Sequence, residues 1–167
     1  MNSIVIMGVA GCGKSSLGTA VARGFGLPLI EGDDHHSQSN RQKMKDGIAL
    51  NDADRWGWLA ALCDQLRKHP EGAVLTCSAL KRSYRDQLRQ AKPALKFVFL
   101  EISRQAAQER VVARGQHFFH SSLVDSQFAT LETPVSEDEV LRLDASLPLR
   151  DLQAAVNQWL PEYKEVV

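Results

Sequence analysis

The strongest chemical signal in the sequence is a glycine-rich stretch near the N-terminus. Residues 8–15 read Gly-Val-Ala-Gly-Cys-Gly-Lys-Ser, the pattern GxxxxGK followed by Ser or Thr, whose backbone N–H groups surround nucleotide phosphates. Lys14 is expected to reach the β- and γ-phosphates, and Ser15 to ligate Mg²⁺. The apolar run before this loop and the helical pattern after it favour this interpretation over a plain turn with an exposed lysine. The sequence thus predicts that ATP and Mg²⁺ bind at Gly8, Val9, Ala10, Gly11, Cys12, Gly13, Lys14, Ser15 and Ser16.

An acidic cluster, residues 31–36, ends the second apolar run and reads Glu-Gly-Asp-Asp-His-His. A carboxylate at this point would lie beside the phosphate loop, at the edge of the sheet where α/β proteins bind ligands. Asp33 is the candidate base, because phosphoryl transfer to a hydroxyl needs a carboxylate close to the attacking oxygen. The alternative is that Asp33 and Asp34 cap the next helix, and this is the favoured interpretation for Asp34.

Two arginines, Arg110 and Arg114, lie four residues apart and share one face of a predicted helix. They are further candidates for nucleotide binding. Negative charge spreads over the transferring phosphoryl oxygens, and an arginine carried by a closing lid would stabilise it. Arg114 is the favoured catalytic arginine because it adjoins the predicted lid. A solvated basic stripe paired with Glu109 is the alternative.

Short apolar runs alternate with segments of helical period, which predicts an α/β fold with a parallel sheet. The predicted strands are 3–7, 27–31, 73–77, 96–102 and 140–144. Three predicted helices have both ends: 14–25, stopped by Gly26; Ser103 to Arg114, ended by Gly115; and Leu149 to Trp159. Two more are predicted from apolar stripes, one of Leu59, Leu62 and Leu66, with Asp52 or Asp54 as its cap, and one of Tyr84, Leu88 and Ala91.

Two segments, 32–51 and 116–134, are longer than ordinary connections of ~2 to 6 residues. Each contains short helical signals, many polar residues and two histidines, and the second also contains three phenylalanines. We interpret them as an acceptor-binding insertion, about 32–58, and a mobile lid, about 115–134. The aromatic residues Phe118, Phe119 and Phe128 are expected to pack within the lid. The acidic run 136–139 is expected to be a solvated turn.

Composition limits the class of protein. The chain has 167 residues, 44% hydrophobic and 24% charged, which predicts one globular domain, 1–167. Twenty basic residues balance twenty acidic ones, which argues against nucleic acid or a membrane surface as a partner. Three cysteines without CxxC spacing, and no apolar run near ~18 residues, predict a cytoplasmic protein without a signal peptide.

The nucleotide loop leaves the acceptor open. The Asn-Lys-x-Asp pattern of guanine-specific proteins does not occur in the sequence, and three scattered cysteines cannot form a four-cysteine zinc lid. A kinase for a small metabolite remains. The alternative from another class is a module that binds ATP without phosphorylating a small molecule.

Three stretches at matching spacing resemble the bacterial-type gluconate kinases. These stretches are Gly32-Asp33-x-x-His36-x-x-x-Asn40-x-x-Lys43-Met44-x-x-Gly47-x-x-Leu50-Asn51-Asp52-x-Asp54-Arg55-x-x-Trp58-Leu59, Cys77-Ser78-Ala79-Leu80-Lys81-x-x-Tyr84-Arg85, and His117-Phe118-Phe119 with Ser126-Gln127-Phe128-x-x-Leu131-Glu132-x-Pro134. The resemblance implies a P-loop kinase fold of five parallel strands in the order 2-3-1-4-5, and a homodimer. It also implies transfer of the γ-phosphate of ATP to the 6-hydroxyl of D-gluconate, giving 6-phospho-D-gluconate.

A linear polyol acid needs cations for its carboxylate and hydrogen bonds for its hydroxyls. With the resemblance, Arg55, Lys81 and Arg85 are the candidate cations and His36 is a hydroxyl partner, beside Asp33. The alternative for Arg55 is a salt bridge with Asp52 or Asp54. The alternative for Lys81 and Arg85 is a solvated helix face with Asp86, and His36 could instead be a packed structural histidine. Trp58 is a candidate to seal the acceptor pocket.

Two positions depart from the family pattern. Ser37 and Gly57 stand where the family usually has proline, and both changes restore φ freedom to the backbone. The alternative hypothesis for the acceptor is that the chain is a kinase for shikimate or for another aldonate.

Overall fold

The computed structural model describes residues 2–115 and 120–160. Its centre is a sheet of five parallel strands in the order β2 (Leu29–Glu31), β3 (Val74–Thr76), β1 (Ile4–Met7), β4 (Lys96–Glu101) and β5 (Val140–Asp144). All five predicted strands and the implied strand order are confirmed. The central strands β1 and β3 are buried at every residue, as apolar strands covered on both faces must be.

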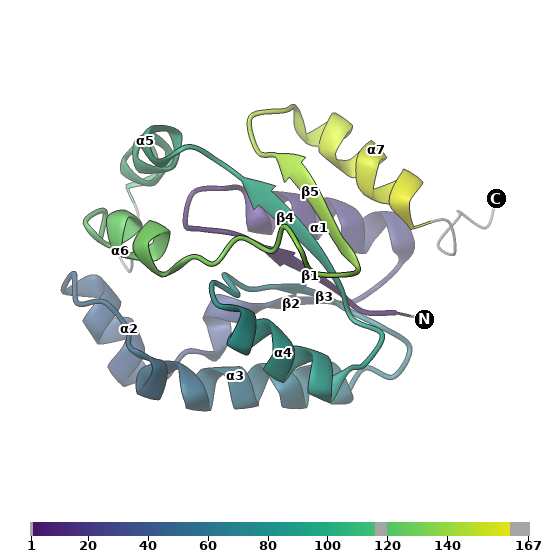
Figure 1. Ribbon diagram of the computed structural model, residues 1–167, viewed down its shortest axis with the longest axis horizontal. Coiled ribbons are helices and arrows are strands. Elements are labelled where there is room, and N and C mark those ends of the chain that lie inside the picture. The colour runs from purple at the N-terminus through teal and green to yellow at the C-terminus, as the bar shows by residue number, and fades with distance from the viewer. Residues whose placement is uncertain (1, 116–119, 161–167) are drawn as a thin grey trace.

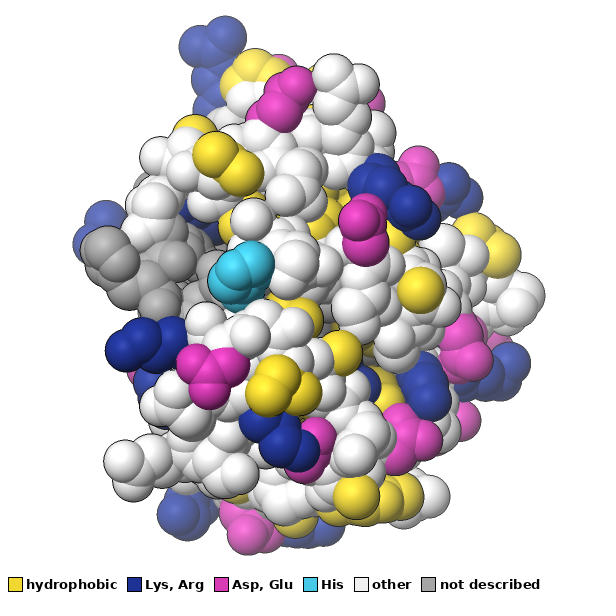
Figure 2. All heavy atoms as spheres, turned by 90° about the vertical axis from the view of Figure 1, so that its left-hand side faces the viewer, with side chains coloured by type: hydrophobic (Ala, Val, Ile, Leu, Met, Phe, Trp, Pro, Cys, Tyr) yellow, Lys and Arg dark blue, Asp and Glu magenta, His cyan; other side chains and the backbone are white. Residues whose placement is uncertain are grey.

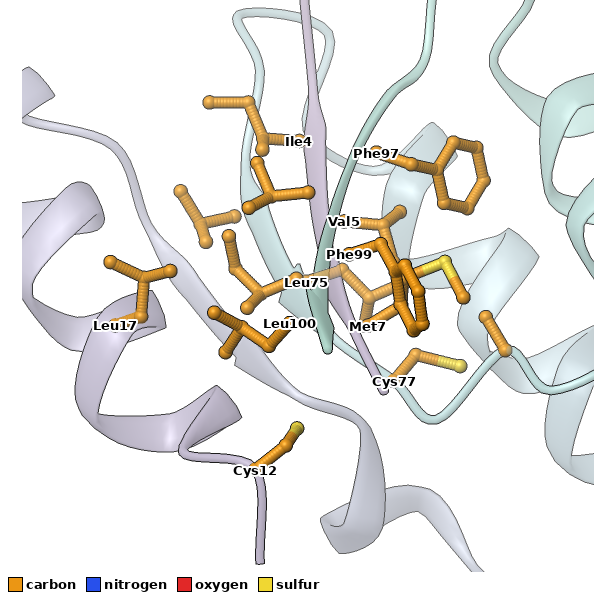
Figure 3. Packing of buried hydrophobic residues seen from close by; sticks show 14 of the residues in the cluster. Ile4, Val5, Met7, Cys12, Leu17, Leu75, Cys77, Phe97, Phe99 and Leu100 are labelled. Atoms are coloured by element: carbon orange, nitrogen blue, oxygen red, sulfur yellow. The ribbon is translucent and has the colours of Figure 1, made fainter. Parts of the chain in front are cut away.

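Helices cover both faces of this sheet (Figure 1). The contacting pair α1 (Lys14–Phe25) and α7 (Leu149–Trp159) lies on one side, and the pair α3 (Asp52–Arg67) and α4 (Arg82–Ala91) lies on the other. Figure 3 shows the same division in the core, with Leu17 on one side of the strands and Phe97 and Phe99 on the other. Among the described residues, no helix is long and apolar enough to cross a bilayer.

Local signals determine most helix ends. Gly26 takes a left-handed φ of 65° after α1, and Gly115 takes one of 56° after α5 (Arg104–Arg114), as predicted. The Ser103 hydroxyl caps α5. The predicted cap of α3 is wrong: Asn51 is the N-cap, and Asp54 completes a capping box by accepting from the Asn51 N–H.

The two long segments contain short helices at one end of the molecule (Figure 1). The first contains η1 (Gly32–His35) and α2 (Gln38–Lys45), and the second contains α6 (Leu123–Thr130). Ser37 caps α2 by accepting from the Asn40 N–H at 3.0 Å, so this departure from the family pattern supplies a helix cap. The predicted lid residues His117, Phe118 and Phe119 lie outside the described residues.

Candidate active site

A cavity of about 290 Å³ opens at the carboxyl edge of the sheet, between the phosphate loop, the insertion and α6. Its lining comes from three parts of the chain: Ala10, Gly11, Gly13, Lys14 and Ser15 from the loop; Glu31, Asp33, Asp34, His36, Met44, Ala49, Leu50, Arg55, Trp58 and Ser78 from the acceptor side; and Arg114 at the end of α5 with Leu123, Ser126 and Gln127 from the lid. Figure 2 looks at this end of the molecule and shows acidic and basic side chains interspersed.

The phosphate loop takes its form from glycine. Gly8 and Gly11 have φ of 146° and 84°, and a Cβ at either position would lie 2.8 Å from a backbone carbonyl oxygen, so only glycine fits. Helix α1 begins at Lys14 without a side-chain cap, which leaves its first N–H groups free to bind an anion. The Lys14 ammonium donates to the carbonyls of Gly8 and Val9, at 3.0 and 3.1 Å.

Glu31 joins the loop to two strands and was missed as a site residue. Its Oε2 accepts from the Ser15 hydroxyl at 3.1 Å and from the Thr76 hydroxyl at 2.6 Å. The signal that could have found it is its place at the end of β2, next to the loop. Ser15 and Glu31 together present the hard oxygen donors that Mg²⁺ prefers.

The acceptor side is built around a buried histidine. The His36 ring stacks on Trp58, with centroids 4.3 Å apart and planes at 15°, and the Trp58 indole donates to the Gly32 carbonyl at 2.8 Å. His36 Nε2 lies 4.0 Å from Asp33 Oδ1. Neither Asp33 nor Asp34 caps η1, because its N-cap position is Glu31 and it has no side-chain cap. The capping alternative is therefore wrong.

Burial keeps His36 neutral. Desolvation, followed by the charges of Arg41 and Arg55, lowers the pKa of His36 from 6.5 to about 4. At neutral pH the ring therefore carries one proton and offers one donor and one acceptor.

The predicted cations Arg55 and Lys81 have different surroundings. Arg55 is buried at the cavity wall and donates to the Leu50 carbonyl at 2.9 Å and the Tyr84 hydroxyl at 3.3 Å. Lys81 pairs with Asp52 at 3.0 Å and is not part of the cavity lining. Hydrogen bonds from Tyr84 and then Lys81 lower the pKa of Asp52.

The salt-bridge alternative for Arg55 is not what the structure shows. Asp52 is bound by Lys81 and Tyr84, and Asp54 is bound by Lys43 at 2.8 Å. Arg55 therefore reaches the cavity wall with neutral partners at its guanidinium.

The structure corrects the prediction for Arg85. Its side chain is fully buried outside the cavity lining, and it donates to Glu137 at 2.6 Å and to the carbonyls of Ala79 and Glu132 at 2.6 and 2.8 Å. Arg85 therefore holds neighbouring segments together instead of meeting a substrate carboxylate, and it does not lie on a solvated face with Asp86.

The expected turn at 136–139 is exposed at Ser136, Asp138 and Glu139, and the exception is Glu137. Its side chain is buried and pairs with both Arg85 and Arg89. Burial by itself would raise the pKa of Glu137, but the hydrogen bonds and charges of the two arginines outweigh burial and lower it.

The lid side contributes Arg114, Arg110 and Gln127. Arg114 lines the cavity. Arg110, the other predicted nucleotide-binding arginine, donates to the carbonyls of Gly11 at 3.2 Å and Ala145 at 2.9 Å, and so it does not form the alternative pairing with Glu109. Gln127 of α6 was missed: its Oε1 accepts from the Ala10 N–H at 2.7 Å, and nothing in the local sequence predicts that contact.

Comparisons with known proteins agree with this geometry. A family model described as an AAA domain matches residues 4–134. The chain is 46% identical over 143 residues to a gluconokinase of Gluconobacter oxydans, covering 84% of this chain and 80% of that protein. It is 38% identical over 155 residues to a thermoresistant gluconokinase of Escherichia coli, covering 90% and 89%.

Two solved structures share the whole fold. A crystal structure of a gluconokinase from Sinorhizobium meliloti has a TM-score of 0.85 and 44% identity, covering 98% of both chains. An unliganded sugar kinase from Janibacter has a TM-score of 0.91 and 36% identity, covering 96% of this chain and 95% of that one.

Proposed function

The chain belongs to the gluconokinase family of P-loop kinases with an AAA domain, and from this premise we propose its reaction and the residues that carry it. The enzyme transfers the γ-phosphate of ATP to the 6-hydroxyl of D-gluconate, giving 6-phospho-D-gluconate and ADP. The observation that carries this proposal is that one cavity is lined by the phosphate loop and by Asp33, His36 and Arg55.

On the donor side, the N–H groups of the loop and of the first turn of α1 bind the phosphates. Lys14 releases its bonds to Gly8 and Val9 and turns to the β- and γ-phosphates. Ser15 and Glu31 would hold Mg²⁺, which would neutralise charge on the phosphate oxygens. Arg110 supports the loop from behind, and Arg114 faces the transferring group from the lid.

On the acceptor side, Asp33 accepts the proton of the attacking hydroxyl. The hydroxyl oxygen forms the new bond to the γ-phosphorus as the bond to the β–γ bridging oxygen breaks, and ADP leaves with that electron pair. Asp33 afterwards returns its proton to solvent. The cations proposed for the carboxylate of the sugar acid are Arg55, at the cavity wall, and Lys81, which lies outside the cavity lining and pairs with Asp52.

Three wider proposals rest on the family and on composition. The chain forms one domain, with an insertion at about 32–58 and a lid at about 115–134. It works as a homodimer in the cytoplasm, with a small-molecule substrate and without nucleic acid or membrane partners. Equal numbers of basic and acidic residues support the last point.

The test is ADP release from MgATP with D-gluconate, shikimate, other aldonates or no acceptor. We expect strong stimulation by D-gluconate. ADP release that no sugar acid stimulates, together with tight ATP binding, would instead indicate a nucleotide-dependent binding module.

A further inference from the structure

Asn40 is a buried polar residue of α2 whose side-chain orientation is determined by its surroundings. It is 4% exposed, and its Nδ2 lies 2.8 Å from the backbone carbonyl oxygen of Asp54. A carbonyl oxygen only accepts hydrogen bonds, so the Asn40 atom that faces it must be the amide nitrogen.

The same amide nitrogen also determines where His36 carries its proton. Asn40 Nδ2 lies 3.3 Å from His36 Nδ1, and its second hydrogen is available for that contact. Because an amide NH₂ group cannot accept, Nδ1 must be the acceptor and must carry no proton. A neutral imidazole without a proton on Nδ1 carries it on Nε2.

The protonated nitrogen faces the candidate base. His36 Nε2 lies 4.0 Å from Asp33 Oδ1, which is too long for a direct hydrogen bond. It is a separation that one oxygen can bridge with two bonds of about 2.8 Å. Stacking on Trp58 holds the ring in this orientation.

We propose that Asn40 is a positioning residue that keeps the His36 proton on Nε2, so that the acceptor hydroxyl takes a hydrogen bond from His36 and points its own hydrogen at Asp33. This inference rests on the proposed function and adds the direction of the proton. A hydroxyl donates one hydrogen and accepts others. If Nε2 carried a lone pair instead, it would compete with Asp33 for the hydroxyl hydrogen.

The experiment replaces Asn40 with a side chain that can only accept hydrogen bonds. In Asn40→Asp, the introduced carboxylate attracts a proton to His36 Nδ1. In Asn40→Leu, the volume is kept and both side-chain bonds are lost. Ser39→Ala, at an exposed position of the same helix, is the matched control.

The direct readout is the proton position on His36. Long-range ¹H–¹⁵N spectra of histidine-labelled full-length protein without substrate distinguish the two ring nitrogens, and His36→Gln assigns the signal. We expect wild type and Ser39→Ala to show a bare Nδ1, and Asn40→Asp to show a protonated one. A wild-type protein with its proton on Nδ1 would overturn the inference.

The second readout separates positioning from a merely structural role. We expect kcat/KM for D-gluconate to fall about 10 to 100-fold in Asn40→Asp and less in Asn40→Leu, with KM for ATP close to wild type in both. Equal losses in the two variants would indicate that only the bond to the Asp54 carbonyl matters, and would reject the inference.

The two proposals fail in different ways. A wild-type protein without gluconate-dependent ADP release contradicts the proposed function, whatever the proton position. If Asn40→Asp does not fold, the wild-type spectrum and the Asn40→Leu variant still test the role of Asn40. Full activity of Asn40→Leu, with the His36 proton moved to Nδ1, would contradict the inference.

Discussion

At the scale of single residues, the site places a carboxylate and a neutral imidazole together on the acceptor side of the phosphate loop. The Asp33 side chain is 60% exposed, whereas that of His36 is 4% exposed. The exposed group is free to meet a substrate, and the buried group is held in one orientation.

The exposed carboxylate of Asp33 can be tested by a substitution that keeps its shape. Asp33→Asn keeps the size of the side chain and removes its ability to accept a proton, so kcat should fall by orders of magnitude. Melting temperature should stay near wild type, because the side chain is largely exposed. Steady-state ADP release and thermal unfolding measure the two effects. Near-normal turnover would reject Asp33 as the base.

The buried imidazole of His36 makes the stability of the fold depend on pH. Unfolded His36 takes up a proton near pH 6.5, but folded His36 does so only near pH 4. The unfolded state therefore binds more protons between these values, so this residue's contribution to stability is complete above pH 6.5 and is lost as pH falls to 4. The loss should be about 3 kcal/mol. Urea unfolding at several pH values should show a shallower pH dependence in His36→Gln, and parallel curves would contradict the prediction.

At the scale of elements, a buried ion network joins α4 to the segment that runs from the lid to β5. Arg85 meets Glu137 and the carbonyl of Glu132, while the Glu132 N–H donates to the Leu80 carbonyl and its carboxylate accepts from the Arg82 N–H. These four contacts thus anchor Glu132 and Glu137 to the start of α4 and to Leu80 just before it.

Removing Arg85 should therefore destabilise the fold. Arg85→Met leaves the buried Glu137 carboxylate without its main partner, so we expect unfolding free energy to drop by about 3 to 5 kcal/mol. Arg82→Ala is the control, because that side chain is 62% exposed and should change stability by less than about 0.5 kcal/mol. At a temperature where Arg85→Met is folded, a selective rise in KM for D-gluconate would restore Arg85 as a substrate ligand.

Gly57 offers the opposite change on α3. A Cβ there would meet nothing within 4 Å, and glycine inside a helix costs conformational entropy. Gly57→Ala should raise unfolding free energy by about 0.5 to 1 kcal/mol, seen as a higher melting temperature. Lower stability would mean that the backbone at this position is not helical in solution.

At the scale of the whole molecule, the lid helix contacts the phosphate loop directly. Gln127 and Ala10 are 117 positions apart in the chain and are joined by a 2.7 Å hydrogen bond. The two halves of the sequence thus meet over the nucleotide site, so nucleotide binding and lid position should be coupled.

Gln127→Leu tests that coupling. It leaves the Ala10 N–H without its partner at a cost of about 1 to 2 kcal/mol, so we expect kcat/KM for ATP to fall about tenfold. Asp125→Ala, at a 69% exposed side chain of the same helix, is the control. Equal kinetics in the two variants would show that the bond has no role in turnover.

Contiguous patterns of residues were enough to predict the phosphate loop, the five strands, the glycine stops at Gly26 and Gly115 and the cap at Ser103. These features depend on neighbours along the chain, which share one strand or one helical turn. The strand order came from the resemblance of longer motifs, since periodicity does not encode how strands are arranged.

Only the tertiary structure decided which charged groups meet. Arg85 and Glu137 are 52 positions apart, and each by itself has the pattern of a surface residue. The proton position on His36 likewise depends on the Asp54 carbonyl, which α3 brings to Asn40. Pairings across the fold depend on how elements pack, because burial and the distance between distant groups are properties of the packed molecule and not of any local stretch.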